Sequence, residues 1–180
     1  MERYLDKKSG REFVQLTKNG SNWHMYFTEK VESNIFRMDL ETGIRTQLTD
    51  FSSQFEKAGC YTKCPDSEYL VFVGDGDLYS MNLNTGDVTL LYRCPVGFVL
   101  GHPSISFDKR YVAIAACDIP NVKRAYGNEN YSGFKEAFYG HKVSYLIIAR
   151  MDGTGGEIVF EDTHWMGHVQ FAPDTNEYLT

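Results

Sequence analysis

The segment that predicts the architecture of this chain is His164-Trp165-Met166-Gly167-His168-Val169-Gln170-Phe171-Ala172-Pro173-Asp174. A similar phrase stands earlier, as Gly101-His102-Pro103-Ser104-Ile105-Ser106-Phe107-Asp108, and a less similar one as Gly59-Cys60-Tyr61-Thr62-Lys63-Cys64-Pro65-Asp66. In the first two, Gly-His is followed by an alternating stretch, a Phe and a turn that contains Asp. Three copies of one local pattern indicate a repeat architecture.

A second pattern, Asp/Asn-x-x-Thr-Gly, separates pairs of alternating segments at residues 39–43 and 82–86, with a shorter form at 152–155. In such a turn the Asp, Asn or Thr side chain can hydrogen-bond the turn backbone, and Gly accepts a positive φ. Gly43 and Gly86 are about 43 residues apart, which is the length of a four-stranded propeller blade. The sequence therefore predicts an all-β fold, a partial β-propeller of four-stranded antiparallel blades, with about three to four blades and an incomplete ring.

We expect a single incomplete β-propeller domain over residues 1–180. Its predicted parts are an outer hairpin (1–20), a shortened blade (21–52), a blade (53–96), a blade with an insertion at 118–141 (97–162) and the start of the next blade (163–180). The shortened blade lacks about one strand, and the last blade breaks off in its second strand. This pattern predicts a fragment of a larger propeller, whose open strand edges favour self-association.

The composition limits the classes of partner. A net charge of -6 and a pI near 5.3 argue against a nucleic-acid surface, which should be basic. The sequence has no run of 18 apolar residues, so it predicts no membrane-spanning helix. The first residues also lack the apolar core of a signal peptide, and we therefore expect a cytoplasmic protein.

Four cysteines stand at positions 60, 64, 94 and 117. Cys60 and Cys64 have a CxxxC spacing, but no second Cys or His pair follows at zinc-finger distances. Strand alternation would place both on one face. We interpret all four as reduced thiols packed in a β core.

The histidines are the first candidates for chemistry. His24, His102 and His168 occupy corresponding positions near the inner strands of successive blades. Because inner strands line the central channel of a propeller, the three imidazoles could converge there as metal ligands or as a general base. The alternative is that they are structural histidines. Trp165 could likewise offer its face to a sugar ring or simply be packed.

The insertion at 118–141 is basic and aromatic in an acidic chain, and residues 131–139 could form a short helix. Loops on rigid scaffolds often carry binding residues, so Arg124 and Lys135 are candidates; a plain surface loop is the alternative. The sequence contains neither a Gly-x-Ser-x-Gly elbow nor a phosphate-binding loop.

Several segments resemble the oligogalacturonate lyases, the propeller family known as polysaccharide lyase family 22. They are His24-Met25-Tyr26-Phe27, Phe36-Arg37-Met38-Asp39-Leu40, Gln47-Leu48-Thr49, Phe134-Lys135-Glu136-Ala137-Phe138-Tyr139 and Trp165-Met166-Gly167-His168. The resemblance implies a seven-bladed propeller that cleaves oligogalacturonides by β-elimination in pectin degradation in the bacterial cytosol. It also implies a Mn²⁺ ion that stabilises the developing enediolate. In the family pattern the catalytic His and the metal ligands belong to later blades, so the resemblance assigns neither role to a residue of this chain.

The resemblance thus implies that this chain supplies one wall of the substrate cleft, and that the chain alone is inactive. The candidate substrate-binding residues are His24, Lys63, His102, Arg124, Lys135, Trp165 and His168. Two other hypotheses about the function of the chain stay open. The chain could be a non-catalytic TolB-like propeller module that binds a protein or carbohydrate partner, or a folded remnant without activity.

Overall fold

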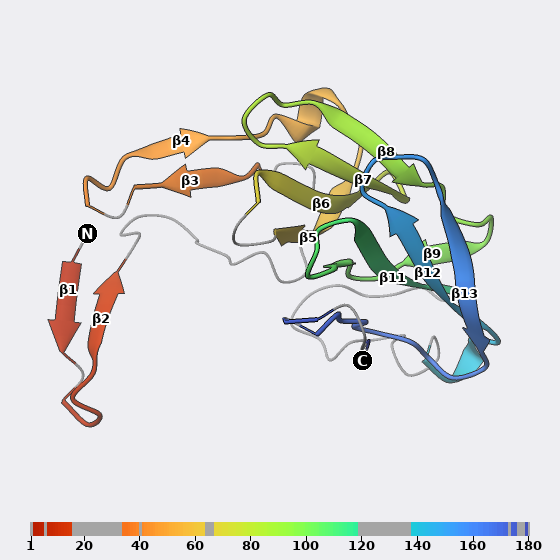
Figure 1. Ribbon diagram of the computed structural model, residues 1–180. Helices are drawn as coiled ribbons and strands as arrows, with labels where there is room; N and C mark the ends of the chain where they lie inside the picture. Colours follow the sequence, from red (N-terminus) through yellow and green to blue (C-terminus); the bar gives the residue numbers. More distant parts are fainter. Residues whose placement is uncertain are drawn as a thin grey trace.

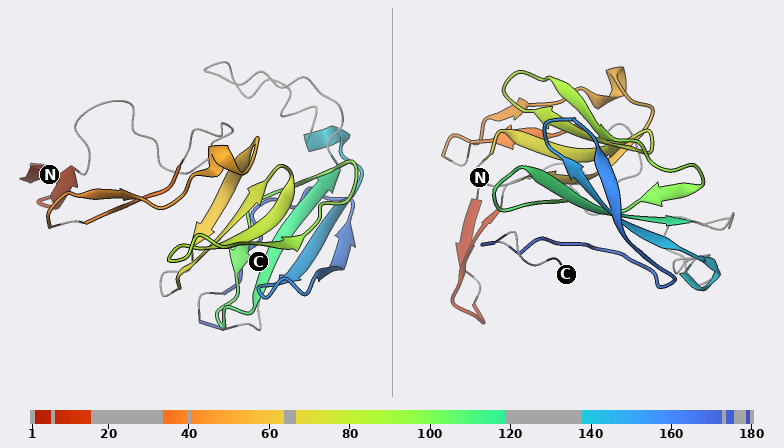
Figure 2. Two further views of the ribbon diagram at one scale, coloured as in Figure 1. Left: turned by 90° about the horizontal axis from the view of Figure 1, so that it is seen from above. Right: turned by 45° about the vertical axis from the view of Figure 1, so that its right-hand side comes forward.

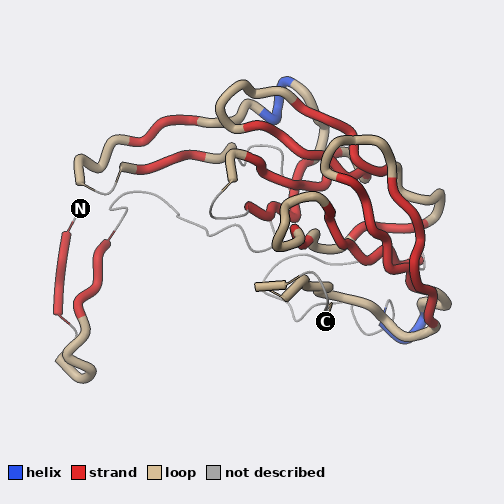
Figure 3. The backbone as a smooth tube through the Cα atoms, in the orientation of Figure 1, coloured by secondary structure: helices blue, strands red, loops and turns tan. Residues whose placement is uncertain are grey.

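The computed structural model describes residues 2–5, 7–15, 34–39, 41–63, 67–118, 138–172, 174–175 and 179. These residues form small antiparallel sheets that follow one another along the chain (Figures 1 and 3). The predicted fold class, an all-β partial propeller, is confirmed. A 3₁₀ turn covers Phe51–Ser53. Residues 138–140 are helical, at the end of the 131–139 segment where a short helix was expected, and residues 131–137 of that segment lie outside the described residues. None of the helices in the described part is long and apolar enough to cross a membrane.

The first complete blade is a four-stranded sheet whose strands pair in chain order. They are β5 (Ala58–Lys63), β6 (Tyr69–Gly74), β7 (Asp77–Asn82) and β8 (Val88–Tyr92). The inner strand β5 carries a bulge, because its register with β6 shifts between Gly59 and Thr62 and Cys60 has a φ of 52°. The simple alternation predicted from Cys60 onward is therefore wrong, and Cys64 lies outside the described residues.

The second blade has the same order, but its inner strand is split. Its strands are β9 (Phe98–Leu100), β10 (Ser104–Ile105), β11 (Tyr111–Asp118), β12 (Ser144–Arg150) and β13 (Gly156–Asp162). Both β9 and β10 pair with β11, opposite residues 116–118 and 112–113 respectively. The Gly101-His102-Pro103 segment fills the gap between these two short strands.

Two further hairpins precede the blades. They are β1 (Glu2–Leu5) with β2 (Glu12–Gln15), and β3 (Phe36–Met38) with β4 (Arg45–Gln47). The turn after β3 works as predicted, because Asp39 Oδ1 accepts the N–H groups of Glu41 at 3.1 Å and Thr42 at 2.6 Å, while Gly43 has a φ of 73°. The turn after β7 repeats this arrangement around Asn82, whose Oδ1 accepts the N–H groups of the second and third residues after it.

Neighbouring sheets lie face to face (Figure 2), and apolar side chains pack between them. One core cluster combines Val71 and Leu78 of the first blade with Ile114 and Ile147 of the second. A second cluster covers the other face of the first blade and includes Phe51 and Phe72. A third covers the other face of the second blade, where Val169 of the C-terminal segment packs on Ala113 and Ala115. Strands β6 and β11 are thus buried on both faces, as central strands between packed layers must be.

The pairing of β11 with β12 defines two ends of the second blade. Cys117 is opposite Ser144 at the end where the insertion leaves the sheet, which we call the insertion end. Tyr111 is opposite Arg150 at the other, which we call the turn end because the β10–β11 and β12–β13 turns lie there.

The described cysteines Cys60, Cys94 and Cys117 are free thiols. Burial, followed by the nearby Asp77 carboxylate, raises the pKa of Cys94 to about 11. Such a thiol is unreactive at neutral pH, which agrees with a packed, reduced cysteine.

Candidate functional site

The two Gly-His segments lie side by side. The ring centroids of His102 and His168 are 5.0 Å apart, and their planes are nearly perpendicular. The backbones also approach closely, because a Cβ on Gly101 would lie 3.4 Å from the Gly167 carbonyl oxygen. The Gly101 N–H donates to the Ala115 carbonyl at 2.8 Å, which fixes the first segment to β11. The repeat thus brings together two of the three predicted imidazoles.

The two imidazoles differ in their surroundings. His102 is partly buried, whereas His168 is exposed. Burial, and then the charge of His168, lowers the pKa of His102 below its ordinary value. His102 is consequently a neutral ring at pH 7, in which one ring nitrogen is an N–H donor and the other carries a lone pair.

An aromatic cluster, formed by Phe138, His141 and Trp165, adjoins this pair. The ring centroids of Phe138 and Trp165 are 5.8 Å apart, and those of His141 and Trp165 are 5.4 Å apart at 87°. Trp165 also packs near the second Gly-His segment, since a Cβ on Gly167 would lie 3.7 Å from its Nε1. The returning end of the insertion is therefore held against the residues that precede His168.

Polar contacts anchor the insertion end. Asp118 Oδ1 accepts the N–H groups of Lys142 at 2.8 Å and Val143 at 3.0 Å. Burial raises the pKa of Asp118, but these amide groups outweigh it and hold that pKa below its ordinary value. The Cys117 thiol donates to the Met166 carbonyl at 3.2 Å, and the Met166 N–H donates to Ser144 Oγ at 3.3 Å. The cluster thus rests on the ends of two buried strands.

The other predicted residues are less well placed for a common site. Lys63 ends β5 and is exposed; the hydroxyl of its neighbour Thr62 donates to the Pro103 carbonyl at 2.7 Å, so this strand end lies beside the His102 segment. Candidates His24, Arg124 and Lys135 lie outside the described residues.

Sequence reasoning did not single out Phe138 or His141 as site residues. The available signal was their position in the basic, aromatic insertion, but their partner Trp165 belongs to a different segment. Only the folded chain shows that these segments meet.

The described residues do not make a manganese site. Among them, no three His, Cys, Asp or Glu side chains converge on one point. The His102–His168 pair offers two imidazoles, whereas Mn²⁺ prefers sites rich in carboxylate, carbonyl and water oxygens.

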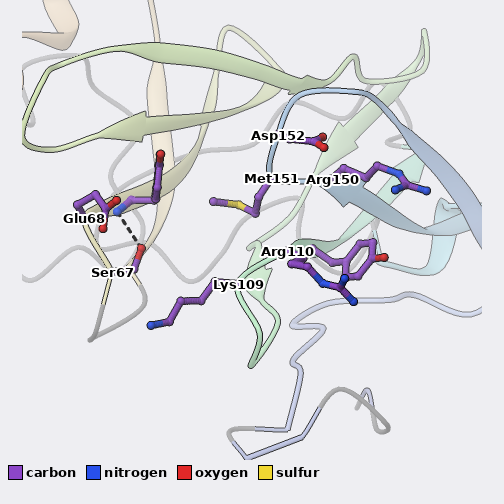
Figure 4. Close-up of a pocket in the computed structure, with 9 residues that line it drawn as sticks. Ser67, Glu68, Lys109, Arg110, Arg150, Met151 and Asp152 are labelled. Carbon is purple, nitrogen blue, oxygen red and sulfur yellow. Dashed lines mark hydrogen bonds between the residues drawn. The ribbon is translucent and has the colours of Figure 1, made fainter.

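A cavity of about 590 Å³ lies at the turn end, between the two blades (Figure 4). It is lined by Ser67, Glu68, Tyr69, Lys109, Arg110, Tyr111, Arg150, Met151 and Asp152. The Nε–H of Arg110 donates a hydrogen bond to Asp108 Oδ2 at 2.7 Å. The side chains of Lys109 and Arg150 point away from one another (Figure 4). The cavity thus lacks a convergent set of polar groups. It lies at the Tyr111 end of β11, whereas Asp118 and the insertion lie at the other end of that strand.

No family model and no curated protein matches this chain. Solved structures do match it. An oligogalacturonate lyase in complex with manganese superposes on 94% of this chain and 49% of its own, with a TM-score of 0.68 and 18% identity. The oligogalacturonate lyase of Vibrio parahaemolyticus matches with the same coverage, a TM-score of 0.66 and 16% identity. The chain has the fold of these lyases.

The fold is also similar to a putative TolB from Agrobacterium tumefaciens, over 81% of this chain and 48% of that one, with a TM-score of 0.53 and 16% identity. The chain spans about half the length of these structures. The likeness predicted from sequence segments is thus confirmed for the fold.

Proposed function

We propose that this chain supplies one wall of the oligogalacturonide-binding cleft of an oligogalacturonate lyase-like protein. The observation that carries the proposal is the His102–His168 pair beside Trp165, in a fold similar to such a lyase over 94% of the chain. Partly exposed imidazoles and one indole ring suit a sugar that carries a carboxylate.

The chemistry of β-elimination explains what such a wall would do. A base removes the C5 proton of a uronate, the electron pair forms the C4–C5 double bond, and the C4–O bond to the leaving sugar breaks. The leaving oxygen then takes up a proton. The C5 proton is weakly acidic, so donors to the uronate carboxylate lower the barrier by stabilising the enediolate charge.

In this proposal the imidazoles bind and orient the substrate, and neither acts as the base. His102 donates an N–H to a carboxylate or hydroxyl oxygen, and His168 does so from its exposed position. Trp165 packs against the C–H face of the sugar ring, as aromatic side chains do in mixed apolar and polar sites.

The test is a calorimetric titration of the chain with trigalacturonate. His168→Ala and His102→Ala should each weaken binding about tenfold, the value of one good hydrogen bond. The matched control is His164→Ala. His164 lies on the same connection, three residues before Gly167; its side chain is 87% exposed, and its Nδ1 lies 2.8 Å from Asp162 Oδ1. Equal affinities for wild type and His168→Ala would contradict the proposal.

Activity should be absent from this chain alone. An absorbance assay for the unsaturated uronate product, with and without Mn²⁺, is expected to stay at background. Turnover by the isolated chain would show that the reaction centre lies within these residues and would overturn the assignment of the pair to binding only.

The similarity to the putative TolB supports a second candidate, a non-catalytic propeller module that binds a protein or carbohydrate partner. The same titration separates the two. A chain that binds a neutral trigalactoside as tightly as trigalacturonate, or that binds neither, favours the module.

A further inference from the structure

Strand β13 (Gly156–Asp162) forms the outer edge of the second blade (Figures 1 and 2). It pairs with β12 on one side, and no strand of the described residues pairs with it on the other. Every residue of β13 except Asp162 is exposed. The N–H and C=O groups on the outer side of this strand can therefore pair with a strand from another chain.

The middle of β13 is apolar. Ile158, Val159 and Phe160 are 43%, 49% and 52% exposed. Ile158 is opposite Ile147, which packs toward the first blade, whereas Phe160 is opposite Leu146, which packs toward the C-terminal segment. Because opposite residues point to the same face of a sheet, the exposed apolar surface extends over both sides of the edge. A partner that packs on one face would leave the other side exposed, whereas an added strand contacts both.

The two ends of β13 are acidic. Glu157 precedes the apolar residues, and Glu161 and Asp162 follow them. Asp162 Oδ1 lies 2.8 Å from Nδ1 of His164, whereas neither glutamate forms an ion pair within the described part of the chain. Two exposed carboxylates thus flank the apolar centre. They favour a partner strand that carries cations at both ends, because opposite charges on neighbouring strands attract.

The same charges disfavour a second copy of β13 as the partner. In the antiparallel register that places the apolar residues of two copies opposite one another, Glu157 of each copy is opposite Glu161 of the other. Like charges directly opposite each other destabilise a sheet, and charged side chains on an edge strand protect it from pairing with itself. The edge therefore discriminates against its own copy and in favour of a basic strand.

We propose that β13 is a docking site for an extended protein segment whose apolar centre is flanked by Lys or Arg residues. The segment adds to the sheet as a further strand, with its apolar side chains against Ile158 and Phe160 and its cations beside Glu157 and Glu161. This edge is on the opposite side of the sheet from the inner strands β9 and β10 that flank His102. The inference therefore does not depend on the proposed function.

The test uses synthetic peptides with blocked ends, labelled with fluorescein and titrated with the full chain in an anisotropy assay. The first peptide is Arg-Lys-Val-Thr-Val-Thr-Lys-Arg. The second has Glu at each basic position, and the third has Pro in place of both Thr, which removes N–H groups that a strand needs. Wild type should bind the first peptide and neither of the others. A dissociation constant for the first peptide above about 0.1 mM would contradict the proposal.

Variants of β13 test the chemistry of the partner. Glu157→Lys/Glu161→Lys should weaken binding of the basic peptide about tenfold or more and should create binding of the acidic one. The matched control, Glu41→Lys/Glu56→Lys, makes the same change of net charge at two exposed acids outside the second blade. At physiological salt, which screens distant charges, it should leave binding unchanged. Phe160→Thr keeps a residue that favours strands but removes apolar surface, so it should also weaken binding.

Hydrogen exchange followed by mass spectrometry locates the bound peptide. The basic peptide should slow exchange in β13 and leave the β1–β2 hairpin unchanged. Slower exchange in another sheet without a change in β13, or equal affinities for the basic and acidic peptides, would show that β13 is not the site. A dimer in analytical ultracentrifugation that Phe160→Thr dissociates would also overturn the proposal, because the edge would then bind a second copy of the chain.

Discussion

At the scale of single residues, Asp108 explains why Asp recurs in the turn after the inner strand. The Ser106 hydroxyl donates to its Oδ1 at 2.7 Å, and Arg110 donates its backbone N–H at 3.1 Å and its Nε–H at 2.7 Å. Ser106 is 1% exposed and its Oγ in turn accepts the Tyr111 N–H at 3.0 Å. One carboxylate thus closes the β10–β11 turn and leads the chain into β11.

These donors, first the Ser106 hydroxyl and then Arg110, lower the pKa of Asp108 to about 2 from an ordinary value of 3.8. Because the folded state depresses this pKa, its contribution to stability is complete above pH 4 and is lost as the pH falls towards 2. Asp108→Ala should therefore lower the unfolding free energy at pH 7 by about 1 to 2 kcal/mol, and this difference should shrink below pH 4. Thermal unfolding between pH 7 and pH 2 measures it, with the exposed Asp174→Ala as control; a difference that grows in acid would contradict it.

The sequence predicted local roles well, since Asp39 and Asn82 act within their own turns. Repetition of the same phrase marked His102 and His168, which the structure places side by side, and their role in binding stays a prediction. The contact of His141 with Trp165 was not predicted, because Trp165 lies in another segment and the insertion has no copy elsewhere in the chain. The cavity at the turn end was likewise not predicted from the sequence, because three separate segments of the chain line it.

At the scale of elements, two turn glycines separate the strain of a turn from the packing of blades. Gly86 has a φ of 80°, and a Cβ added there would meet nothing within 4 Å. Gly153 has a φ of 75°, but its Cβ would lie 2.6 Å from Thr89 Cγ2 and 3.2 Å from the Leu90 carbonyl oxygen of the neighbouring blade. The β12–β13 turn therefore rests directly on β8.

Gly86→Ala should cost about 1 kcal/mol, the strain of a left-handed backbone conformation with a Cβ. Gly153→Ala carries the same strain and also pushes one blade from the other, so it should cost at least about 1 kcal/mol more. Urea unfolding of both variants measures the difference, and Asn84→Ala in the Gly86 turn is the control. Equal costs for the two glycines would show that the second blade moves freely against the first.

At the scale of the whole molecule, the blades are joined by cores that neither could form alone. Strand β11 contributes Val112 and Ile114 to the cluster shared with the first blade, and Ala113 and Ala115 to the cluster beneath the C-terminal segment. Alternating positions of one strand thus serve two interfaces. The β1–β2 hairpin, in contrast, stands apart from both blades (Figures 1 and 2).

This arrangement predicts that the two blades unfold as one unit and the hairpin does not unfold with them. Ile114 is fully buried in the shared cluster, so Ile114→Ala should lower the unfolding free energy by about 2 to 5 kcal/mol. Hydrogen exchange followed by mass spectrometry should then speed up in β6 as well as in β11, because opening either blade exposes the same core. The hairpin amides should exchange at an unchanged rate, and Val159→Ala, on a side chain that is 49% exposed, should alter neither blade. Faster exchange confined to the β9–β13 sheet would mean that each blade is stable by itself, and that the shared core adds contact without cooperativity.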